Sequence, residues 1–302
     1  MNLNQITLFV RVVETGSFAE AARLLDLPRS SVSRGVAALE KSLGVRLLQR
    51  TTRQLNLTEE GREYYQAVSR SLAGLDDAAA AVTHQQEEPG GQLRITASMD
   101  VGLYLLAPVT AKLLARYPQI SVDTELTPRV VDIVQEGFDL ALRVGKLSDS
   151  RLVARHLGLL HQGVFASQDY LAAHGTPQSV ANLAAHRCIS FMGVHHWRLI
   201  GPAGSSTVQI QSTANSDNLQ FSQALVADGI GIGLLPLYSV VDDERLVRLL
   251  PDYATAGNPL QLVYPGARYL PKRMTLLRDT LLDTIPGQLA NQCEKLARAK
   301  QQ

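Results

Sequence analysis

The stretch SFAEAARLLDLPRSSVSRGVAALEKSLGVRLLQR spans residues 17–50 and contains the start signals of two helices. Ser17 is a good N-cap, and Glu20 stands three residues later, which is the capping-box spacing. These residues predict a helix over 18–25. Pro28 suits the start of the next helix, because its fixed backbone angle is already helical. Upstream, apolar residues at helical spacing predict one more helix: Leu3, Ile6, Phe9, Val10 and Val13.

The helix after Pro28 has two faces of different chemistry. It is predicted over residues 29–43, and Gly44 ends it. At about 100° per residue, one face is apolar and is expected to be buried: Val32, Val36, Leu39 and Leu43. The opposite face is short-chained, hydroxyl-rich and basic: Ser30, Arg34, Ala37 and Lys41, flanked by Ser31 and Ser33. Such a face suits a helix that enters the major groove of duplex DNA, whereas a plain three-helix module would more often show Glu/Lys pairs there.

Net charge says little about the partner of this chain, but the distribution of charge says more. The 302 residues hold 29 Lys/Arg and 28 Asp/Glu, a formal charge of +1. Residues 29–53 contain a single acid, Glu40, and six basic residues: Arg29, Arg34, Lys41, Arg46, Arg50 and Arg53. A local excess of this kind attracts a phosphate backbone, although a solvated basic surface would have the same composition.

A hairpin is predicted after this helix, because the polar and basic residues 50–54 have β-compatible residues on both sides. Its tip would lie along the DNA backbone or in the minor groove. Three runs now resemble the winged helix-turn-helix of the LysR-type transcriptional regulators: F-V-R-V-V-E-T-G-S-F-A-E-A-A-R-L-L, S-S-V-S-R-x-V-x-x-L-E-x-x-L-G-V-R-L-L-x-R and L-T-E-E-G. This resemblance covers residues 1 to about 61 and is highly specific.

The family resemblance implies which residues contact DNA. At the start of the recognition helix they are Arg29, Ser30, Ser31, Ser33 and Arg34, and in the wing they are Arg50 and Arg53. Many members carry Gln-Pro or Ser-Gln where this chain has Arg29-Ser30, which leaves the DNA sequence that it reads open. The implied partner is double-stranded DNA with a pseudo-palindromic operator.

A long linker helix is predicted over residues 61–89, with Thr58 as a suitable cap before it. Apolar residues follow at spacings of 3, 4, 3, 4 and 3: Tyr65, Val68, Leu72, Leu75, Ala79 and Val82. Such a heptad seam indicates pairing with a second copy, in a dimer or a tetramer, so that two recognition helices reach two half-sites. The alternative is packing of the seam on its own domain.

The C-terminal unit, residues 90–302, is predicted to be α/β. Strands at 93–98, 120–126 and 139–144 alternate with helices at 103–116 and 128–136, which predicts a parallel sheet covered by helices. A second run begins at 164–167, and residues 260–264 with a helix at 271–285 return to the first lobe. The motifs D-L-A-L-R-V-G and A-D-G-I-G-I-G-L-L-P resemble the two-lobed, periplasmic-binding-protein-like effector domain of the same family. We expect lobe I at about 90–160 and 265–302, and lobe II at about 161–264.

A small-molecule effector is expected between these lobes, because ligands of open α/β sheets bind at the carboxyl ends of the strands. The first lobe places Ser98, Met99, Thr127, Arg143 and Gly145 there, and the resemblance implies that Asn218 and Leu235 face them from the second lobe. Arg143 favours an anionic effector. The alternatives are that Ser98 and Thr127 cap helices and that Arg143 forms a structural ion pair.

Other classes of function find no support in the motifs. The spacing Gly229-x-Gly231-x-Gly233 is not that of a dinucleotide fingerprint, and no metalloprotease, P-loop or serine-hydrolase motif is present. Cys188 and Cys293 lie far apart, which argues against a disulfide framework or a CxxC metal site. No metal and no cofactor are expected. Without a basic leader or a long apolar run, a cytoplasmic, nucleoid-associated regulator is expected, not a membrane protein. The competing hypothesis is an enzyme or solute-binding domain with a fused DNA-binding arm, which would need a nucleophile–base set.

Overall fold

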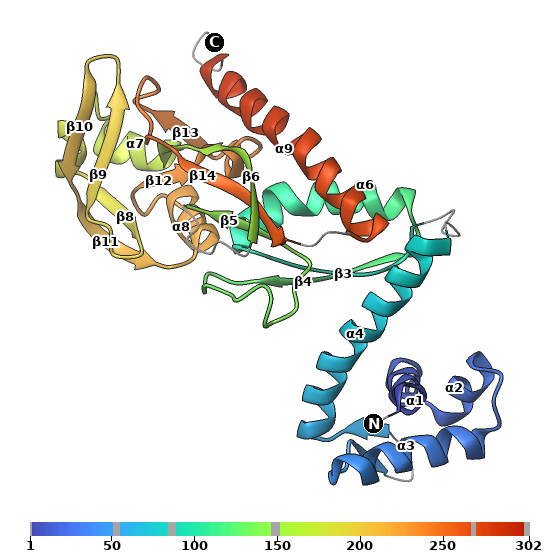
Figure 1. Cartoon of the computed structure of the whole chain (residues 1–302). Coiled ribbons are helices and arrows are strands. Elements are labelled where there is room, and N and C mark those ends of the chain that lie inside the picture. Colours follow the sequence, from blue (N-terminus) through green and yellow to red (C-terminus); the bar gives the residue numbers. More distant parts are fainter. Residues whose placement is uncertain (1, 51–54, 84–88, 146–151, 267–269, 299–302) are drawn as a thin grey trace. The chain divides into compact units, whose positions relative to one another are not determined.

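The computed structural model describes residues 2–50, 55–83, 89–145, 152–266 and 270–298 (Figure 1). They divide into two compact units, Met1–Glu87 and Glu88–Gln302. The first unit contains helices and a hairpin, and the second contains two α/β lobes, which confirms the predicted fold class.

The N-terminal unit is built from three packed helices, a hairpin and a long final helix. Its helices are α1 (Leu3–Thr15), α2 (Phe18–Leu24), α3 (Arg29–Leu43) and α4 (Glu59–Thr83). Between α3 and α4, two antiparallel strands form the wing: β1 (Leu48–Arg50) and β2 (Leu55–Leu57). This is the arrangement of a winged helix-turn-helix.

Local signals explain where these helices begin and end. The Ser17 hydroxyl accepts hydrogen bonds from the backbone N–H groups of Ala19 and Glu20, so Ser17 is the N-cap of α2. Gly16 and Gly44 end α1 and α3 in the left-handed conformation, with φ of 64° and 73°, which glycine adopts without strain.

The apolar face of α3 forms much of the core of this unit. The residues buried there together are Phe9, Val32, Val36 and Leu39. Leu43, expected with them, is only half-buried. Gly35 lets α3 approach α1 closely, because a Cβ at this position would lie 2.3 Å from Leu8 Cδ1. These contacts hold α3 with its opposite face outward.

The apolar seam of α4 is divided between two environments. Its first part, Tyr65, Val68 and Leu72, is half-buried and packs against the core of the N-terminal unit. Leu75 is 51% exposed. The side chains of Ala79 and Val82 lie outside the described residues. Packing on its own domain therefore accounts for the first half of the seam, whereas Leu75 is left exposed.

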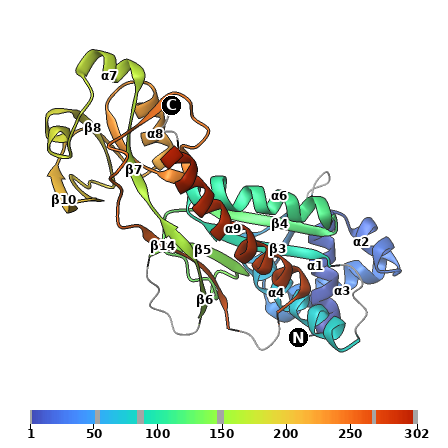
Figure 2. The same cartoon turned by 90° about the horizontal axis from the view of Figure 1, so that it is seen from above.

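Lobe I is a five-stranded sheet in the order β4-β3-β5-β14-β6. Its strands are β3 (Gly91–Ala97), β4 (Ile120–Leu126), β5 (Leu140–Val144), β6 (Leu152–Leu160) and β14 (Asn258–Pro265). The sheet is mixed, not parallel as predicted, because β14 runs antiparallel to β5 and β6. Helices α6 (Ala107–Arg116) and α9 (Lys272–Arg298) lie on the same face of this sheet (Figures 1 and 2). A short helix α5 (Met99–Val101) and a π-helical turn (Gly102–Leu106) lead from β3 into α6.

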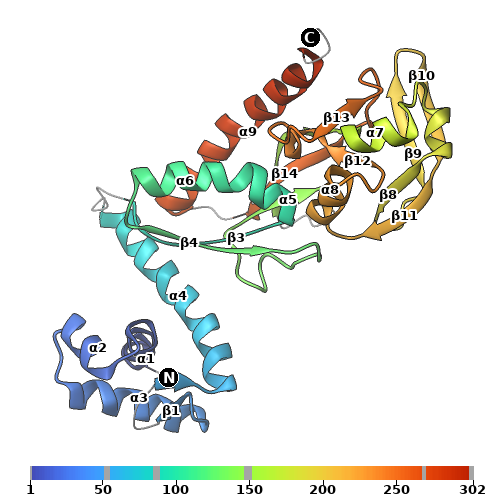
Figure 3. The same cartoon turned by 180° about the vertical axis from the view of Figure 1, so that it is seen from behind.

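Lobe II is a second mixed sheet, in the order β11-β8-β12-β7-β13 (Figure 3). Its strands are β7 (Gln162–Ser167), β8 (Arg187–Phe191), β11 (Gln211–Ser216), β12 (Ile232–Pro236) and β13 (Leu246–Leu249). Its α-helices are α7 (Gln168–His174) and α8 (Leu219–Ala227). A separate hairpin, β9 (His196–Gly201) with β10 (Gly204–Gln209), adds to its core through Trp197 and Leu199.

The chain crosses between the lobes at two adjacent segments. The first crossing lies at His161, between β6 and β7, and the second precedes β14. The two are tied together, because the Gln162 N–H donates to Thr255 Oγ1 at 2.9 Å and the Thr255 N–H donates to the Gln162 carbonyl at 3.0 Å. The chain has therefore returned to lobe I before residue 258, earlier than the expected lobe boundary at 264.

The helix predicted over residues 128–136 is wrong, because the structure has only a turn there. Asp132 Oδ1 accepts hydrogen bonds from the N–H groups of Val134 and Gln135, at 3.0 and 2.9 Å. A side-chain acceptor of this kind competes with the carbonyl groups that a helix would use, and the β-branched residues around it lower the helix propensity.

Candidate functional site

The outward face of α3 carries the recognition-helix residues that the sequence predicts to contact DNA. Five residues of α3 on this side are exposed: Arg29, Ser30, Arg34, Ala37 and Lys41. Ser31 and Ser33 are half-buried at its flank. The Arg34 Nε donates to the Ser30 carbonyl at 3.4 Å, which keeps the guanidinium on this surface. Small side chains and one well-placed guanidinium together allow close approach to base edges.

The N-terminal end of α3 is open to an anion. Pro28 occupies the N-cap position without a side-chain hydrogen bond, and the first turn contains no acidic residue. The first N–H groups of a helix carry a partial positive charge and are frequent contacts of phosphate groups. Arg29 adds a full positive charge at the same end. The chemistry of this end matches a DNA backbone.

Glu40, the single acid in the basic stretch, has a structural role that the sequence analysis missed. Its Oε1 accepts hydrogen bonds from the backbone N–H groups of Leu47 and Leu48, at 2.9 and 3.0 Å. These bonds join the recognition helix to the first strand of the wing. The sequence did contain a signal for this role of Glu40. An acid without a partner would weaken a phosphate-binding surface, so a single carboxylate in a basic segment suggests a structural contact.

The wing is described only in part. Its two strands pair with Leu48 opposite Leu57 and Arg50 opposite Leu55. Arg53 and the side chain of Arg50 lie outside the described residues. Their contacts with DNA therefore stay a prediction.

In lobe I, strand register brings three predicted effector residues to one edge of the sheet. Ala97, the last residue of β3, stands opposite Leu126 of β4 and Leu142 of β5. The residues that follow these positions are Ser98, Thr127 and Arg143. Ser98 is the N-cap of α5 but makes no side-chain capping bond, and its Oγ is buried without a hydrogen-bond partner among the described residues. Most buried hydroxyl groups in proteins have a hydrogen-bond partner, so this one is unusual.

Arg143 is partly buried and forms no ion pair with the described residues. Its guanidinium donates to the Arg129 carbonyl at 3.2 Å and to Thr96 Oγ1 at 3.3 Å. The nearby carboxylates of Glu125 and Glu136 instead pair with Arg129, at 2.7 and 2.5 Å. Burial lowers the pKa of Arg143, and the charge of Arg129 lowers it further. The charges of Glu136 and Glu125 oppose this shift in part, although neither carboxylate is bonded to Arg143.

The remaining predicted effector residues have different surroundings. Met99 is exposed, and the Gly145 N–H donates to the Pro259 carbonyl at 2.8 Å. Asn218 is the N-cap of α8, because its Oδ1 accepts from the Phe221 N–H at 3.0 Å. Leu235 was expected to face the cleft. It is instead fully buried in the core of lobe II, because β12 is an inner strand that packs this side chain among apolar neighbours.

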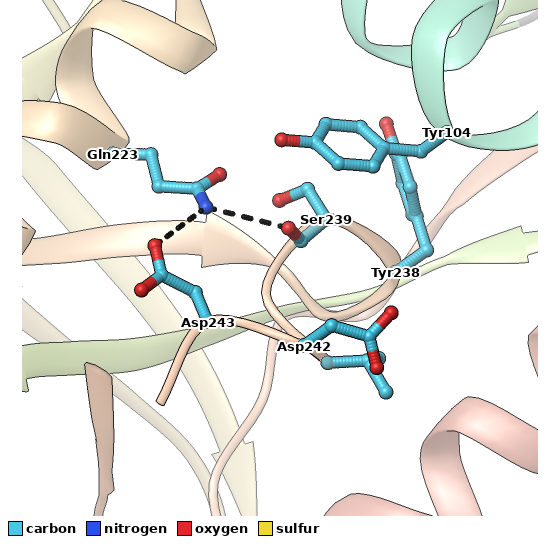
Figure 4. A pocket seen from close by; sticks show the side chains of 7 residues that line it. Tyr104, Gln223, Tyr238, Ser239, Asp242 and Asp243 are labelled. Atoms are coloured by element: carbon cyan, nitrogen blue, oxygen red, sulfur yellow. Dashed lines mark hydrogen bonds between the residues drawn. The ribbon is translucent and has the colours of Figure 1, made fainter. Parts of the chain in front are cut away.

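A cavity of about 300 Å³ lies elsewhere between the lobes, lined by residues that the sequence analysis did not identify (Figure 4). Tyr104 comes from lobe I, whereas Gln223 and Asp243 come from lobe II. None of the predicted effector residues lines it. No hydrophobic alternation or sequence motif marks these positions. They are far apart in the sequence and come together only where the two lobes meet.

Two kinds of site are not found in the described part of the chain. No group of three or more His, Cys, Asp or Glu side chains is placed to hold a metal ion. No described helix is both long enough and apolar enough to cross a membrane.

Two family models match the chain. Residues 3–62 match the model described as a bacterial regulatory helix-turn-helix protein of the lysR family. Residues 86–286 match the model of the LysR substrate binding domain. The matches together cover both units of the structure.

Similar proteins span nearly the whole chain. The HTH-type transcriptional regulator CrgA of Neisseria meningitidis serogroup C (strain 8013) is 37% identical over 294 residues, which cover 96% of this chain and 98% of CrgA. The HTH-type transcriptional activator AaeR of Escherichia coli (strain K12) is 35% identical over 288 residues, or 93% of each chain. The solved structure of CrgA from Neisseria meningitidis superposes with a TM-score of 0.60 at 36% identity, covering 94% of this chain and 99% of that one. The full-length Vibrio cholerae virulence activator AphB gives a TM-score of 0.59 at 26% identity, covering 94% and 100%.

Proposed function

The chain belongs to the LysR family of transcription regulators, and from this premise we propose that it is a dimer or tetramer that binds a pseudo-palindromic operator under the control of an anionic effector. It is a regulator with a helix-turn-helix and a substrate-binding domain, not an enzyme. A ligand that favours one arrangement of the two lobes would shift the geometry of the pair of recognition helices and so the affinity for DNA.

The observation that carries the DNA-binding part is the exposed face of α3. It presents Ser30 and Arg34 next to an open helix N-terminus, and no acidic residue stands in the first turn. The experiment is genome-wide mapping of DNA bound by the chain. We expect a limited set of sites that share two related half-sites about one helical turn apart, as two-fold symmetric helix-turn-helix dimers require. Uniform, sequence-independent occupancy would contradict this proposal.

The effector is proposed to be an anion held near Arg143. Its support is a partly buried guanidinium without a carboxylate partner, at the same sheet edge as the unpaired Ser98 hydroxyl. Charge-assisted hydrogen bonds to a ligand carboxylate would satisfy both groups.

We expect Arg143→Gln to weaken the binding of small carboxylates at least about tenfold, because it removes the charge that would pair with them. Calorimetric titration of the full chain with a panel of carboxylates and their neutral amides measures this loss. Arg155→Gln is the matched control, because Arg155 is an exposed arginine on β6 of the same lobe. An equal loss for acids and amides would argue against an anionic effector.

Self-association is proposed to use the exposed part of the α4 seam. Leu75→Glu should raise the dissociation constant of the dimer, because a charge would enter an apolar helix–helix contact, while the N-terminal core stays intact. Sedimentation velocity measures the change. Leu24→Glu is the control, because Leu24 is an equally exposed leucine of α2 outside the seam. Unchanged sedimentation of the Leu75 variant would exclude this surface as the interface.

A further inference from the structure

The cavity between the lobes is built mainly from aromatic and acidic side chains. We call it the tyrosine cavity and define it by Tyr104, Gln223, Tyr238, Ser239, Asp242 and Asp243 (Figure 4). Val241 also lines this cavity, and an adjoining cavity of about 390 Å³ shares Val241, Asp242 and the two tyrosines with it. Among the described residues, neither cavity is lined by a lysine or an arginine. Their walls therefore offer negative and aromatic groups without a positive one.

The two tyrosines are held at a fixed angle to each other. Their ring centroids are 6.4 Å apart and the ring planes are inclined by 66°. The Tyr238 hydroxyl donates to the buried carboxylate of Asp100, which fixes that ring. Burial raises the pKa of Tyr104, the charges of Asp243 and Asp100 raise it further, and a hydrogen bond with Gln223 lowers it. The ring faces that this edge-to-face contact leaves uncovered carry the negative part of the ring quadrupole and can attract a cation.

The two aspartates of the cavity differ in how well their charges are matched. Asp243 pairs with Arg245 through two contacts of 3.0 Å and also accepts from the Gln223 amide at 3.3 Å. Asp242 is exposed, and its side chain has no hydrogen bond or ion pair with the described residues. Asp242 is therefore the carboxylate in this cavity that has charge available for a ligand, and it lines both cavities.

The adjoining cavity supplies an acceptor and an apolar wall. Gln288 lines it, and the Oε1 atom of this side chain is buried without a hydrogen-bond partner among the described residues. Because this atom has almost no accessible surface, a ligand donor such as an ammonium or guanidinium group reaches it only when the Gln288 side chain turns toward the cavity. Leu103 and Pro108 form an apolar surface beside it, suited to the hydrocarbon part of a ligand.

We propose that the tyrosine cavity and its neighbour bind a small organic cation, a primary amine or a guanidinium compound. The charged group lies against Asp242 and the faces of Tyr104 and Tyr238, and its apolar part extends toward Leu103. This site is separate from the proposed anion site, because the two share no residue. Since Tyr104 belongs to lobe I and Gln223 to lobe II, a ligand in the cavity contacts both lobes and stabilises one arrangement of them.

The test is calorimetric titration of the full chain with benzylamine, which is a cation at neutral pH, and with benzyl alcohol as its neutral counterpart. We expect saturable binding of benzylamine below about 10 mM and at least about tenfold weaker binding of benzyl alcohol. Asp242→Asn should weaken benzylamine binding at least about tenfold, whereas Glu244→Gln, an exposed acid two residues away, should leave it unchanged. The absence of saturable benzylamine binding, or equal affinity for the alcohol, would overturn the proposal.

Two further variants separate the contributions to this site. Tyr104→Phe retains the ring face and should bind benzylamine like the unmodified chain, whereas Tyr104→Leu should lose at least about fivefold in affinity. Arg143→Gln should not affect benzylamine. Arg143 lines neither cavity, so a loss of benzylamine binding in Arg143→Gln as large as in Asp242→Asn would show that the amine is not bound in the tyrosine cavity, and it would refute the second site.

Discussion

Arg34→Ala is expected to lower affinity for the operator by about tenfold to a hundredfold, the value of one well-formed contact to a base edge. Arg34 is exposed on the outward face of α3, opposite the buried Val32, Val36 and Leu39, so its truncation is expected to remove a DNA contact without opening a cavity. Fluorescence anisotropy with a DNA fragment from the mapped sites measures the specific affinity. Circular dichroism of the variant should match that of the unmodified chain.

Two controls test whether the effect of Arg34→Ala is specific to the operator. Arg116→Ala removes an exposed arginine from α6 in the other unit and should leave DNA affinity unchanged. Arg34→Ala should lower the affinity for a scrambled DNA fragment much less. Binding to such a fragment depends on contacts with phosphate groups, which are the same for every sequence. If the variant bound the operator with full affinity, α3 would not be the helix that reads the bases.

Gly61→Ala is expected to destabilise the N-terminal unit by about 3 kcal/mol, the order of cost when a group is forced into a packed site. Gly61 lies in the first turn of α4, where a Cβ would be 1.9 Å from the Leu47 carbonyl oxygen. The backbone at Leu47 cannot move aside as the end of a flexible side chain can. Thr58 holds the same junction, because its Oγ1 donates to the Arg46 carbonyl at 2.7 Å and accepts from the Gly61 N–H at 2.9 Å.

Hydrogen exchange of the α1–α3 amides is the suitable measurement for Gly61→Ala, since a two-unit chain does not unfold in one step. The matched control is Gly74→Ala in the same helix, where a Cβ would meet no atom within 4 Å. That variant should instead gain about 0.5–1 kcal/mol from the better helix propensity of alanine. Equal protection in the two variants would show that the helix start moves away from Leu47 without cost.

The N-terminal unit was largely predictable because its signals are local. The capping residue Ser17, the terminal Gly44 and the two faces of α3 all lie within one or two turns of the backbone they control. The C-terminal unit was less predictable from the sequence. The hairpin of β9 and β10 was overlooked, although Trp197 and Leu199 alternate with exposed residues as in a half-buried strand. The turn around Asp132 was mistaken for a helix, because apolar spacing alone does not register a side chain that competes for backbone donors.

The candidate sites also differ in how far the sequence alone predicts them. The sequence alone predicted which face of α3 is exposed, since a helix presents every third or fourth residue on one side wherever it lies. Tertiary structure decided that Tyr65, Val68 and Leu72 pack on their own unit, that Leu235 is buried, and that Tyr238 meets Asp100 across 138 residues of chain. The periodicity of a segment specifies which of its faces is apolar. Which residues cover that face depends on segments far away in the sequence, and no local pattern predicts that contact.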